Sequence, residues 1–416
     1  MAAQAIIERF LGRMVRKGTL SITLHDGTTF DLGTPAPGYP DVAVRLVGKG
    51  TARKILMDPR IGAGEAFMDG NLLIERGDIM ELIALLRSNR RWEGGGVMVK
   101  PSFFNKIKRN IANRIEQRND AKASTSNVSH HYDIGNDLYR LFLDADHMQY
   151  SCGYWPREGM TLDEAQEAKL AHIASKLALA PGQTVLDIGC GWGGMAIYLA
   201  RHADVKVHGI TLSREQIALA KERAEAAGVA DRVTFEMVDY RALPERGDTY
   251  DRIVSVGMFE HVGRPQFRTF FHAIKSILKP DGVMLLHTIG RMGNPGNTDA
   301  FTRKYIFPGG YIPALTEILG ASQPRRLIAT DVETWRLHYA KTLRAWYANC
   351  FANREAIEAL YDERFFRMWT FYLAGATAAF EHGTMCNYQV QYAPDRHTLP
   401  LSRDYMAEAE QALLNG

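Results

Sequence analysis

The sequence predicts an α/β protein built on a doubly wound, mostly parallel sheet, with a small α+β domain at its N-terminus. Three observations lead to this prediction. Apolar strand-like runs alternate with helical patterns from about residue 170 onward. A glycine-rich loop joins the first of these strands to the first of these helices. Before them, residues 1–90 hold a hairpin pattern and several helical segments.

The N-terminal domain is predicted element by element. Residues 1–17 have the apolar spacing of a helix. The segment LSITLHDGTTFDL alternates apolar and polar residues around Asp26-Gly27, which predicts a β-hairpin with a type I′ turn. A further strand is expected at 42–47, and residues 51–89 have a helical pattern.

Residues 91–128 are interpreted as a basic linker. Seven basic and two acidic residues lie between Lys100 and Lys122, and apolar residues recur among them near helical spacing. Two interpretations stay open for this segment: an amphipathic helix on anionic lipid, or a solvated linker helix packed on a neighbouring domain. Lys and Arg exceed Asp and Glu by 7 within residues 1–122, whereas the remainder has an excess of 4 acidic residues. The N-terminal third is therefore expected to face an anionic surface.

The alternating region is predicted as βαβ units. Strands are expected at 184–188, 205–210, 233–238, 252–256 and 283–288, helices at 193–201, 213–227 and 266–278, and a turn at 280–282. Further along, residues 335–380 hold 12 aromatic residues. Their spacing predicts two helix faces, one with Trp335, Tyr339, Leu343 and Trp346 and the other with Phe365, Trp369 and Tyr372.

Composition and cysteine spacing exclude several classes of protein. Apolar residues make up 46% and charged residues 23% of the 416 residues, which is typical of a globular chain. The four cysteines have neither zinc-site nor CxxC spacing, so reduced thiols and a cytoplasmic location are expected. No signal-peptide pattern and no membrane-spanning apolar run is present. No nucleic-acid partner is expected.

The loop VLDIGCGWGG at 185–194 is the first candidate site. Gly189, Gly191 and Gly194 fit the G-x-G-x-x-G pattern, so a dinucleotide site is one interpretation. That interpretation requires an acidic residue at the end of the next strand, where residues 209–213 read GITLS. Asp187 instead stands two residues before the first glycine. This D-x-G-x-G form resembles the loop of class I S-adenosylmethionine (SAM) methyltransferases, which favours SAM over a dinucleotide.

A set of longer motifs is more specific. The motifs, in chain order, are HHYDIGNDLYRLFLD (130–144), YSCGYW (150–155), GITLSREQ (209–216), DYRALP (239–244), VGMFEHVG (256–263), LLHTIG (285–290), KYIFPGGYIP (304–313) and HYAKTLRAW (338–346). Together they resemble the cyclopropane-fatty-acyl-phospholipid synthases, relatives of the mycolic acid cyclopropane synthases. The resemblance covers about residues 125–392, and GTLSITLHDGTTF and IGAGEAFMDG resemble the extra N-terminal domain of the full-length phospholipid enzymes. It implies a Rossmann-like class I SAM-dependent methyltransferase domain at 129–416.

The resemblance also implies roles for individual residues. The implied SAM site comprises Tyr150, Ser151, Asp187, Gly189 and Gly191 at the methionine end, Thr211 and Gln216 at the ribose, and Asp239 and Tyr240 at the adenine. The implied site for bicarbonate, which acts as a general base, comprises Cys152, Glu260, His287, Ile289 through its backbone, and Tyr339. No metal site is expected, because Glu260-His261 lacks HExxH spacing.

The implied activity is transfer of a methylene from SAM across a cis double bond of an unsaturated phospholipid acyl chain, giving a cyclopropane ring. The resemblance further implies a homodimer. Because an acyl chain in a bilayer cannot diffuse through water, peripheral binding to the inner membrane from the cytoplasm is also expected. Two alternatives stay open. One is a related fatty-acyl methyltransferase that gives a methyl- or methylene-branched chain, and the other is a non-catalytic lipid-binding protein on the same fold.

Overall fold

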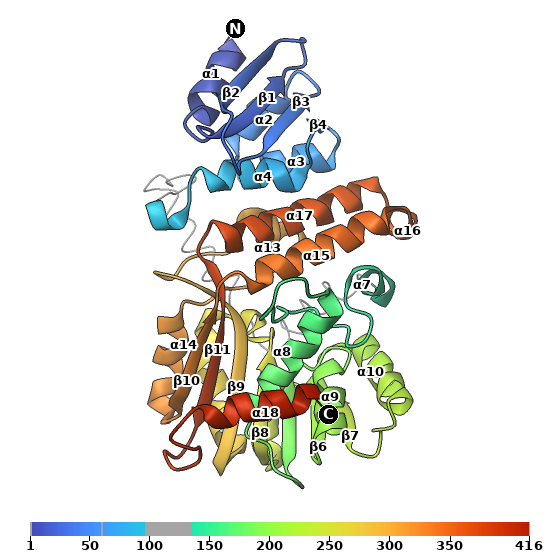
Figure 1. The fold of residues 1–416 in the computed structure, drawn as a ribbon, viewed down its shortest axis with the longest axis vertical. Helices are drawn as coiled ribbons and strands as arrows, with labels where there is room; N and C mark the ends of the chain where they lie inside the picture. The colour runs from blue at the N-terminus through green and yellow to red at the C-terminus, as the bar shows by residue number, and fades with distance from the viewer. Residues whose placement is uncertain (1, 60, 96–134, 416) are drawn as a thin grey trace. The chain divides into compact units, whose positions relative to one another are not determined.

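The computed structural model describes residues 2–59, 61–95 and 135–415, which belong to two compact units (Figure 1). Unit 1 comprises Met1–Arg109, Thr298–Pro308 and Leu343–Met385, and unit 2 comprises Asn110–Asn297, Gly309–Thr342 and Cys386–Gly416. The basic helix expected between Lys100 and Lys122 lies outside the described residues. The boundaries 1–90, 91–128 and 129–416 stay a prediction about functional domains.

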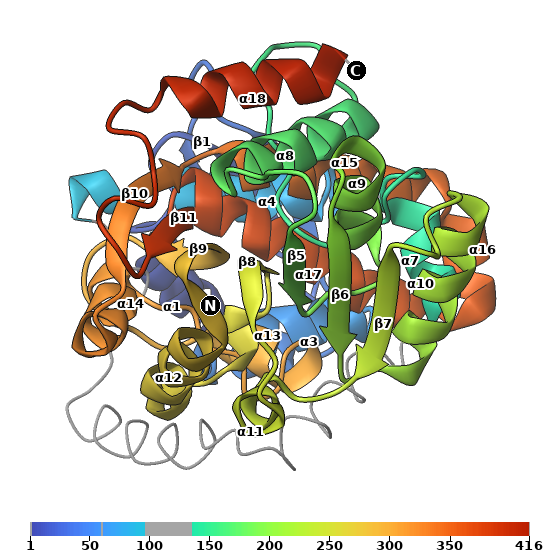
Figure 2. The same cartoon turned by 90° about the horizontal axis from the view of Figure 1, so that it is seen from below.

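Unit 2 is built on a seven-stranded sheet with the order β10-β11-β9-β8-β5-β6-β7 (Figure 2). The strands are β5 (Thr184–Ile188), β6 (Lys206–Thr211), β7 (Val233–Met237), β8 (Tyr250–Val256), β9 (Leu278–Arg291), β10 (Ile328–Trp335) and β11 (Met385–Ala393). Strands β5 to β9 pair in parallel, and β10 pairs with β11 antiparallel. The predicted mostly parallel sheet and its five predicted strands are confirmed.

Helices cover both faces of this sheet (Figure 2). They are α7 (Asn136–Phe142), α8 (Leu162–Lys176), α9 (Gly194–His202), α10 (Arg214–Ala226), α11 (Leu243–Arg246), α12 (Phe267–Ile277), α14 (Leu315–Ser322) and α18 (Asp404–Asn415). Because successive strand residues point to opposite faces, Val185 and Leu285 pack with α8, α9 and α10, whereas Leu186 and Met284 pack with α12 and α14. Both faces are therefore apolar, as a doubly wound sheet requires.

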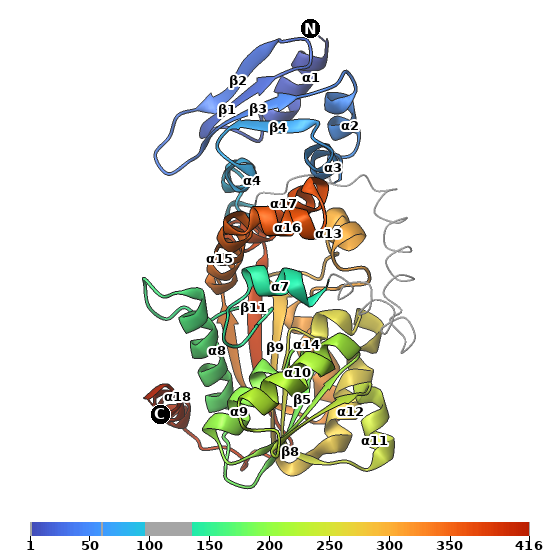
Figure 3. The ribbon, with the colours of Figure 1, turned by 90° about the vertical axis from the view of Figure 1, so that its right-hand side faces the viewer.

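Unit 1 holds a four-stranded sheet with the order β2-β1-β3-β4, with α1 and α2 beside it (Figure 3). Its elements are α1 (Ala2–Leu11), β1 (Gly18–Thr23), β2 (Thr29–Thr34), β3 (Asp41–Leu46), α2 (Thr51–Met57), α3 (Gly62–Met68), β4 (Leu72–Arg76), α4 (Ile79–Ser88), α13 (Ala300–Tyr305), α16 (Arg354–Leu360) and α17 (Glu363–Glu381). Helix α17 packs on α3 and α4, and Arg364 pairs with Asp69 at 2.9 Å. The unit thus joins the N-terminal elements to a later segment of the chain. Helix α15 (His338–Ala352) has residues in both units.

Two predictions in the N-terminal region are wrong in detail. The predicted hairpin forms, but Asp26 does not take the left-handed conformation that a type I′ turn needs. The loop instead closes with Gly27 at φ +83°, and the N–H of Gly27 donates to the carbonyl of Leu24 at 3.0 Å. Residues 51–89 are not wholly helical, because Leu72–Arg76 is a strand that pairs with β3.

Two predictions in unit 2 are also corrected. The expected turn at 280–282 lies inside β9, where the ladder jumps from the pair Tyr250 and Leu278 to the pair Arg252 and Val283. The extra residues form a bulge, so the strand continues through them. Trp335 is the last residue of β10 and does not share a face of α15. Among the residues that the structure describes, no helix is both long and apolar enough to cross a membrane.

Candidate active site

A cavity lies at the carboxyl ends of β5, β6, β7 and β8, closed on another side by the loop 148–151. In an open α/β sheet this edge is the usual place for a ligand. The predicted cofactor residues that line this cavity are Tyr150, Ser151, Asp187, Gly189, Gly191, Thr211, Gln216, Asp239 and Tyr240. The structure therefore brings all nine together, from segments far apart in the sequence.

The glycine loop after β5 allows the backbone to border the cavity directly. Gly189 and Gly191 have φ of +80° and +53°, which residues other than glycine rarely adopt. A Cβ at Gly189 would lie 2.8 Å from the side chain of Met258, whereas one at Gly191 would meet nothing within 4 Å. The backbone N–H groups of Gly189 and Cys190 both donate to the carbonyl of Ile210. The loop is thus fixed against β6 and leaves open space beside Gly191.

Asp187 brings a buried carboxylate to the wall of the cavity. It is 2% exposed, and its Oδ2 atom has no hydrogen-bond partner within the described protein. Burial raises the pKa of Asp187 to about 7, although the charge of Lys169 acts to lower it. A buried, unpartnered carboxylate oxygen is unfavourable unless a ligand satisfies it. The arrangement fits a cationic donor, such as an ammonium group.

The predicted ribose residues contact each other at the end of β6. The hydroxyl of Thr211 donates to Oε1 of Gln216 at 2.7 Å, and both side chains are buried. Ser213 caps α10 by accepting from the N–H of Gln216 at 3.3 Å. The amide nitrogen of Gln216 remains as a donor beside the cavity, which suits a ribose hydroxyl.

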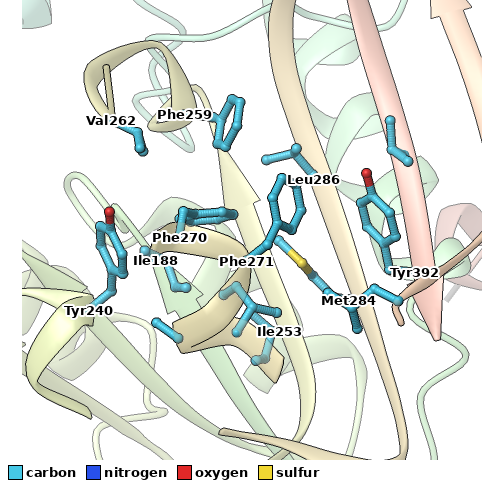
Figure 4. Close-up of a cluster of buried hydrophobic side chains, with 14 of the residues drawn as sticks. Ile188, Tyr240, Ile253, Phe259, Val262, Phe270, Phe271, Met284, Leu286 and Tyr392 are labelled. Carbon is cyan, nitrogen blue, oxygen red and sulfur yellow. The ribbon is translucent and has the colours of Figure 1, made fainter. Parts of the chain in front are cut away.

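Asp239 and Tyr240 follow β7. The carboxylate of Asp239 caps the turn by accepting from the N–H of Arg241 and also binds the Arg241 guanidinium at 2.8 and 2.5 Å. Tyr240 is 8% exposed and packs edge-on against Phe270 at 5.3 Å. It stands at the margin of the buried cluster that also holds Ile188 (Figure 4). The structure thus gives Asp239 a turn-capping role in addition to its position at the cavity.

Two residues of the predicted bicarbonate set are in direct contact. Oε1 of Glu260 accepts from the backbone N–H of Ile289, and Oε2 of Glu260 is buried with no partner within the described protein. Burial raises the pKa of Glu260 to about 7, although the N–H of Ile289 and the hydroxyl of Thr288 act to lower it. Glu260 is not among the residues that line the cavity. Its second oxygen is therefore available to another group.

His287 lies in β9, and side-chain amides of β11 face both of its ring nitrogens. Nε2 lies 3.1 Å from the Asn387 amide, and Nδ1 lies 3.1 Å from the Gln389 amide. Burial lowers the pKa of His287 to about 3, so the ring is neutral. A neutral imidazole has one N–H and one bare nitrogen, so one amide donates to it and the other must present its oxygen. The sequence alone did not indicate this clamp.

Cys152 and Tyr339 complete the predicted set, and both are buried. The thiol of Cys152 donates to the carbonyl of Gly153 at 3.3 Å. Burial raises the pKa of this thiol well above its ordinary value, so Cys152 is not a thiolate. The next residue, Gly153, donates to the hydroxyl of Thr342 at 3.0 Å, on the same helix as Tyr339. The structure thus ties the Cys152 loop to α15.

Two functional candidates were missed by sequence reasoning. Arg241 holds Asp239, and Lys169 donates to the cavity residue Ser151 at 3.1 Å. The signal for Lys169 was available, because it is a charged residue among the alanine and leucine positions of EAQEAKLAHIASK. Within residues 2–59, 61–95 and 135–415, no cluster of His, Cys, Asp or Glu side chains is arranged to hold a metal ion.

Comparison with known proteins agrees with the fold. The structure of the mycolic acid cyclopropane synthase CmaA1 complexed with S-adenosylhomocysteine (SAH) and CTAB is 34% identical, covers 64% of this chain and 97% of that chain, and has a TM-score of 0.60. The larger unit therefore has the fold of the class I SAM-dependent methyltransferases. Residues 119–390 match the family model described as mycolic acid cyclopropane synthetase. The chain belongs to this family, as the sequence motifs predicted.

Two relatives match nearly the whole chain. A probable fatty acid methyltransferase of Pseudomonas putida is 38% identical over 400 residues, which is 93% of this chain and 96% of the relative. The cyclopropane-fatty-acyl-phospholipid synthase of Escherichia coli K12 is 38% identical over 361 residues, which is 87% of this chain and 90% of the relative. Because these matches include the N-terminal region, the similarity extends beyond the methyltransferase domain.

Proposed function

We propose that this chain transfers a methylene group from SAM across a cis double bond of an unsaturated phospholipid acyl chain and leaves a cyclopropane ring. One observation supports the proposal above all. Nine residues chosen from sequence motifs surround a single cavity in a member of the cyclopropane synthetase family. The similarity to the Escherichia coli phospholipid enzyme supports the choice of substrate.

The residues around the cavity fit SAM. Tyr150, Ser151 and the glycine loop would hold its methionine end, and the unpartnered oxygen of Asp187 suits the ammonium group there. Thr211 with Gln216 would bind the ribose. Asp239 and Tyr240 would contact the adenine. SAM supplies an electrophilic methyl group on its sulfonium centre.

The protein's main task in this reaction is alignment without water. An alkene is a weak and uncharged nucleophile, so the methyl group must be held against it in a dry site. The buried side chains at the cavity wall and the backbone of the glycine loop provide such a boundary. Positive charge moves from sulfur to the acyl chain during the reaction. Competing nucleophiles must therefore be kept from reacting with the acyl carbocation. The protonated thiol of Cys152 meets this condition, and side-chain amides occupy both ring nitrogens of His287.

We further propose that Cys152, Glu260, His287, Ile289 and Tyr339 hold a bicarbonate ion. Bicarbonate would supply the base for the proton that leaves as the ring closes. The buried oxygen of Glu260 without a partner supports this site, because it can accept the hydroxyl proton of the anion. His287 can offer a ring N–H to an anion only by replacing one of its two amide contacts.

We also propose that the chain acts in the cytoplasm as a homodimer bound reversibly to the inner membrane. The domain 1–90 and the linker 91–128 would make the contact, because the first 122 residues carry the basic excess. Each well-placed Lys or Arg contributes about 1 kcal/mol on anionic lipid. Flotation with anionic vesicles is expected to weaken with salt and on neutralising Lys106, Lys108 and Arg109. Binding that is insensitive to both changes contradicts this proposal.

A second candidate is a fatty-acyl methyltransferase with a branched product. The Pseudomonas putida relative, described as a probable fatty acid methyltransferase, favours it. Both reactions begin with the same methyl transfer to the double bond. They differ in whether the resulting carbocation closes a ring as it loses a methyl proton or loses a proton to leave a double bond. A non-catalytic lipid-binding protein would transfer no methyl group at all.

The test is an assay of the purified protein with methyl-labelled SAM, bicarbonate and vesicles of cis-monounsaturated phospholipid. Saturated phospholipid vesicles serve as the matched control. We expect label in the unsaturated acyl chains alone, in a product that resists mild hydrogenation because its ring contains no double bond. A labelled product that takes up hydrogen selects the branched-chain enzyme. Absence of label with either lipid contradicts both enzymatic proposals.

A further inference from the structure

Helix α8 presents two polar side chains, Gln166 and Lys169, to the loop that borders the cavity. Both residues are fully buried, at 0% exposure, and their spacing of three places them on one face of the helix. Their neighbours Ala168, Leu170 and Ala171 are also buried. A charged ammonium group in such surroundings is unfavourable unless a partner compensates it.

Gln166 and Lys169 hold the same stretch of chain. The ammonium group of Lys169 donates to Oε1 of Gln149 and to the hydroxyl oxygen of Ser151, the latter at 3.1 Å. The side-chain amide of Gln166 donates to the carbonyl oxygen of Ser151 at 2.9 Å and to that of Gln149 at 3.3 Å. Gln149 and Ser151 both line the cavity. Helix α8 thus holds the loop through the backbone carbonyls of the loop and through the side chains of the loop.

The contact with Lys169 determines where the hydroxyl of Ser151 can point. A hydroxyl oxygen accepts on its lone pairs and has one hydrogen of its own to donate. Because the Ser151 oxygen accepts from Lys169, that hydrogen must turn away from the ammonium group. Ser151 lines the cavity, so a donor is available there. A donor polarised by a neighbouring cation binds an anionic acceptor more strongly than an isolated hydroxyl does.

Of the charged groups near this loop, the carboxylate of Asp187 has an oxygen without a hydrogen-bond partner within the described protein. Both oxygens that Lys169 contacts are uncharged, so the charge of the ammonium group is balanced by more distant carboxylates. Burial lowers the pKa of Lys169 to about 7, and Asp144 and Asp187 act to raise it. The carboxylate of Asp144 is already engaged by the backbone N–H groups of His147 and Gln149. Asp187 lies at the cavity wall, and its Oδ2 atom has no hydrogen-bond partner among the described residues.

We propose that Lys169 is a positioning residue for the amino-acid end of the cofactor. Through the hydroxyl of Ser151 it provides a charge-assisted donor for the carboxylate of that end, while Asp187 accepts from the ammonium group. The cavity would thereby match both charges of the zwitterion. This inference rests on the proposed function, because it takes SAM or its product SAH as the occupant.

The experiment compares two ligands that differ only at this end. SAH carries the amino-acid group, and 5′-methylthioadenosine keeps the adenosine and the sulfur but lacks it. Calorimetric titration of the full chain with each ligand gives two dissociation constants. We expect Lys169→Met to weaken SAH by about 10- to 100-fold, as expected for loss of a charge-assisted hydrogen bond, and to leave methylthioadenosine unchanged. A general loosening of the loop would weaken the binding of both ligands equally, and that result overturns the proposal.

Lys176→Met is the matched control, because Lys176 is on the same helix, equally buried and absent from the cavity lining. Its ratio of the two constants is expected to equal that of the wild type. If Lys169→Met does not fold, Ser151→Ala tests the same contact and is expected to show the same selective loss of SAH. Unchanged SAH affinity in Ser151→Ala overturns the proposal. Wild-type protein that binds neither ligand contradicts the proposed function itself.

Discussion

Helix α8 carries two fully buried lysines seven residues apart, and their surroundings differ. Lys176 pairs with Glu333 and lies 3.6 Å from Asp331. Lys169 contacts two uncharged oxygens beside the cavity. Carboxylates show the same contrast. Lys176 and His172 outweigh burial and hold the pKa of Glu333 well below its usual range, whereas burial raises the pKa of Asp187 to about 7.

The difference distinguishes charges that are paired within the protein from charges beside the cavity that a ligand would pair. A buried ion pair with carboxylate partners is balanced within the protein, and removing one partner leaves the other uncompensated. A buried charge without such partners lowers stability and is retained where it serves a site. The same helix therefore contributes to structure at its C-terminal end and, on our account, to cofactor binding two turns earlier.

The largest effect is expected on stability, from Lys176→Met. This change leaves the carboxylates of Glu333 and Asp331 without their buried cation, which we expect to lower the free energy of unfolding by about 3 kcal/mol. Urea unfolding of the variant and the wild type measures it. A loss below about 1 kcal/mol would show that His172 and Arg403, the other partners of these carboxylates, suffice without Lys176.

The next effect is on binding, from Asp187→Asn. The amide keeps the shape of the side chain but removes the negative charge, so we expect SAH to bind about 10- to 100-fold more weakly. Methylthioadenosine, which lacks the ammonium group, is expected to bind as it does to the wild type. Calorimetric titration of both ligands checks this. Equal weakening of the two would place Asp187 among the residues that only shape the loop.

A smaller effect is expected on the stability of Lys169→Met. Replacing a buried charge that lacks a close carboxylate by an apolar side chain of similar length is neutral or stabilising, by about 0–2 kcal/mol. The unfolding experiment that finds a loss for Lys176→Met is therefore expected to find none for Lys169→Met. A loss of equal size in the two variants would break the contrast between the lysines.

The smallest effect concerns pH. Burial alone would lower the pKa of His172, but its hydrogen bonds to Glu333 and Glu410, both at 2.8 Å, outweigh burial and raise it. A raised folded-state pKa stabilises the protein fully below about pH 6.5 and progressively less as the pH rises through the folded-state value. The difference in unfolding free energy between the wild type and His172→Gln is expected to shrink from pH 6 to pH 9. A difference that grows with pH would contradict the assignment.

The sequence predicts the sheet well because strands buried on both faces give nearly continuous apolar runs, as at 283–286. It fails at Leu72–Arg76, since the run LLIER is as favourable to a helix as to a strand. There the pairing with β3 decides the conformation. Such a choice depends on a segment elsewhere in the chain and leaves little trace in local spacing.

In the candidate site, too, residues within sequence motifs were predicted, and contacts between distant segments were not. Residues within motifs, such as Asp187 and Gly191, were predicted and line the cavity. The clamp on His287 was not predicted, because Asn387 lies 100 residues away in the sequence and neither residue type identifies the other. The sequence marks Lys169 as an unusual charged residue in its helix, but its contacts with Gln149 and Ser151 depend on the path of a loop and were not predicted. Contacts that form only through the tertiary fold cannot be predicted from the spacing of residues in the sequence.

On the proposed function, the ring carbon comes from the methyl group of SAM. It is tested most directly with SAM whose methyl group carries three deuterium atoms and with cis-monounsaturated phospholipid vesicles. We expect an acyl product that has gained one carbon, retains two of the three deuterium atoms and resists mild hydrogenation. A product that retains all three deuterium atoms, or that takes up hydrogen, would contradict ring closure by loss of a methyl proton.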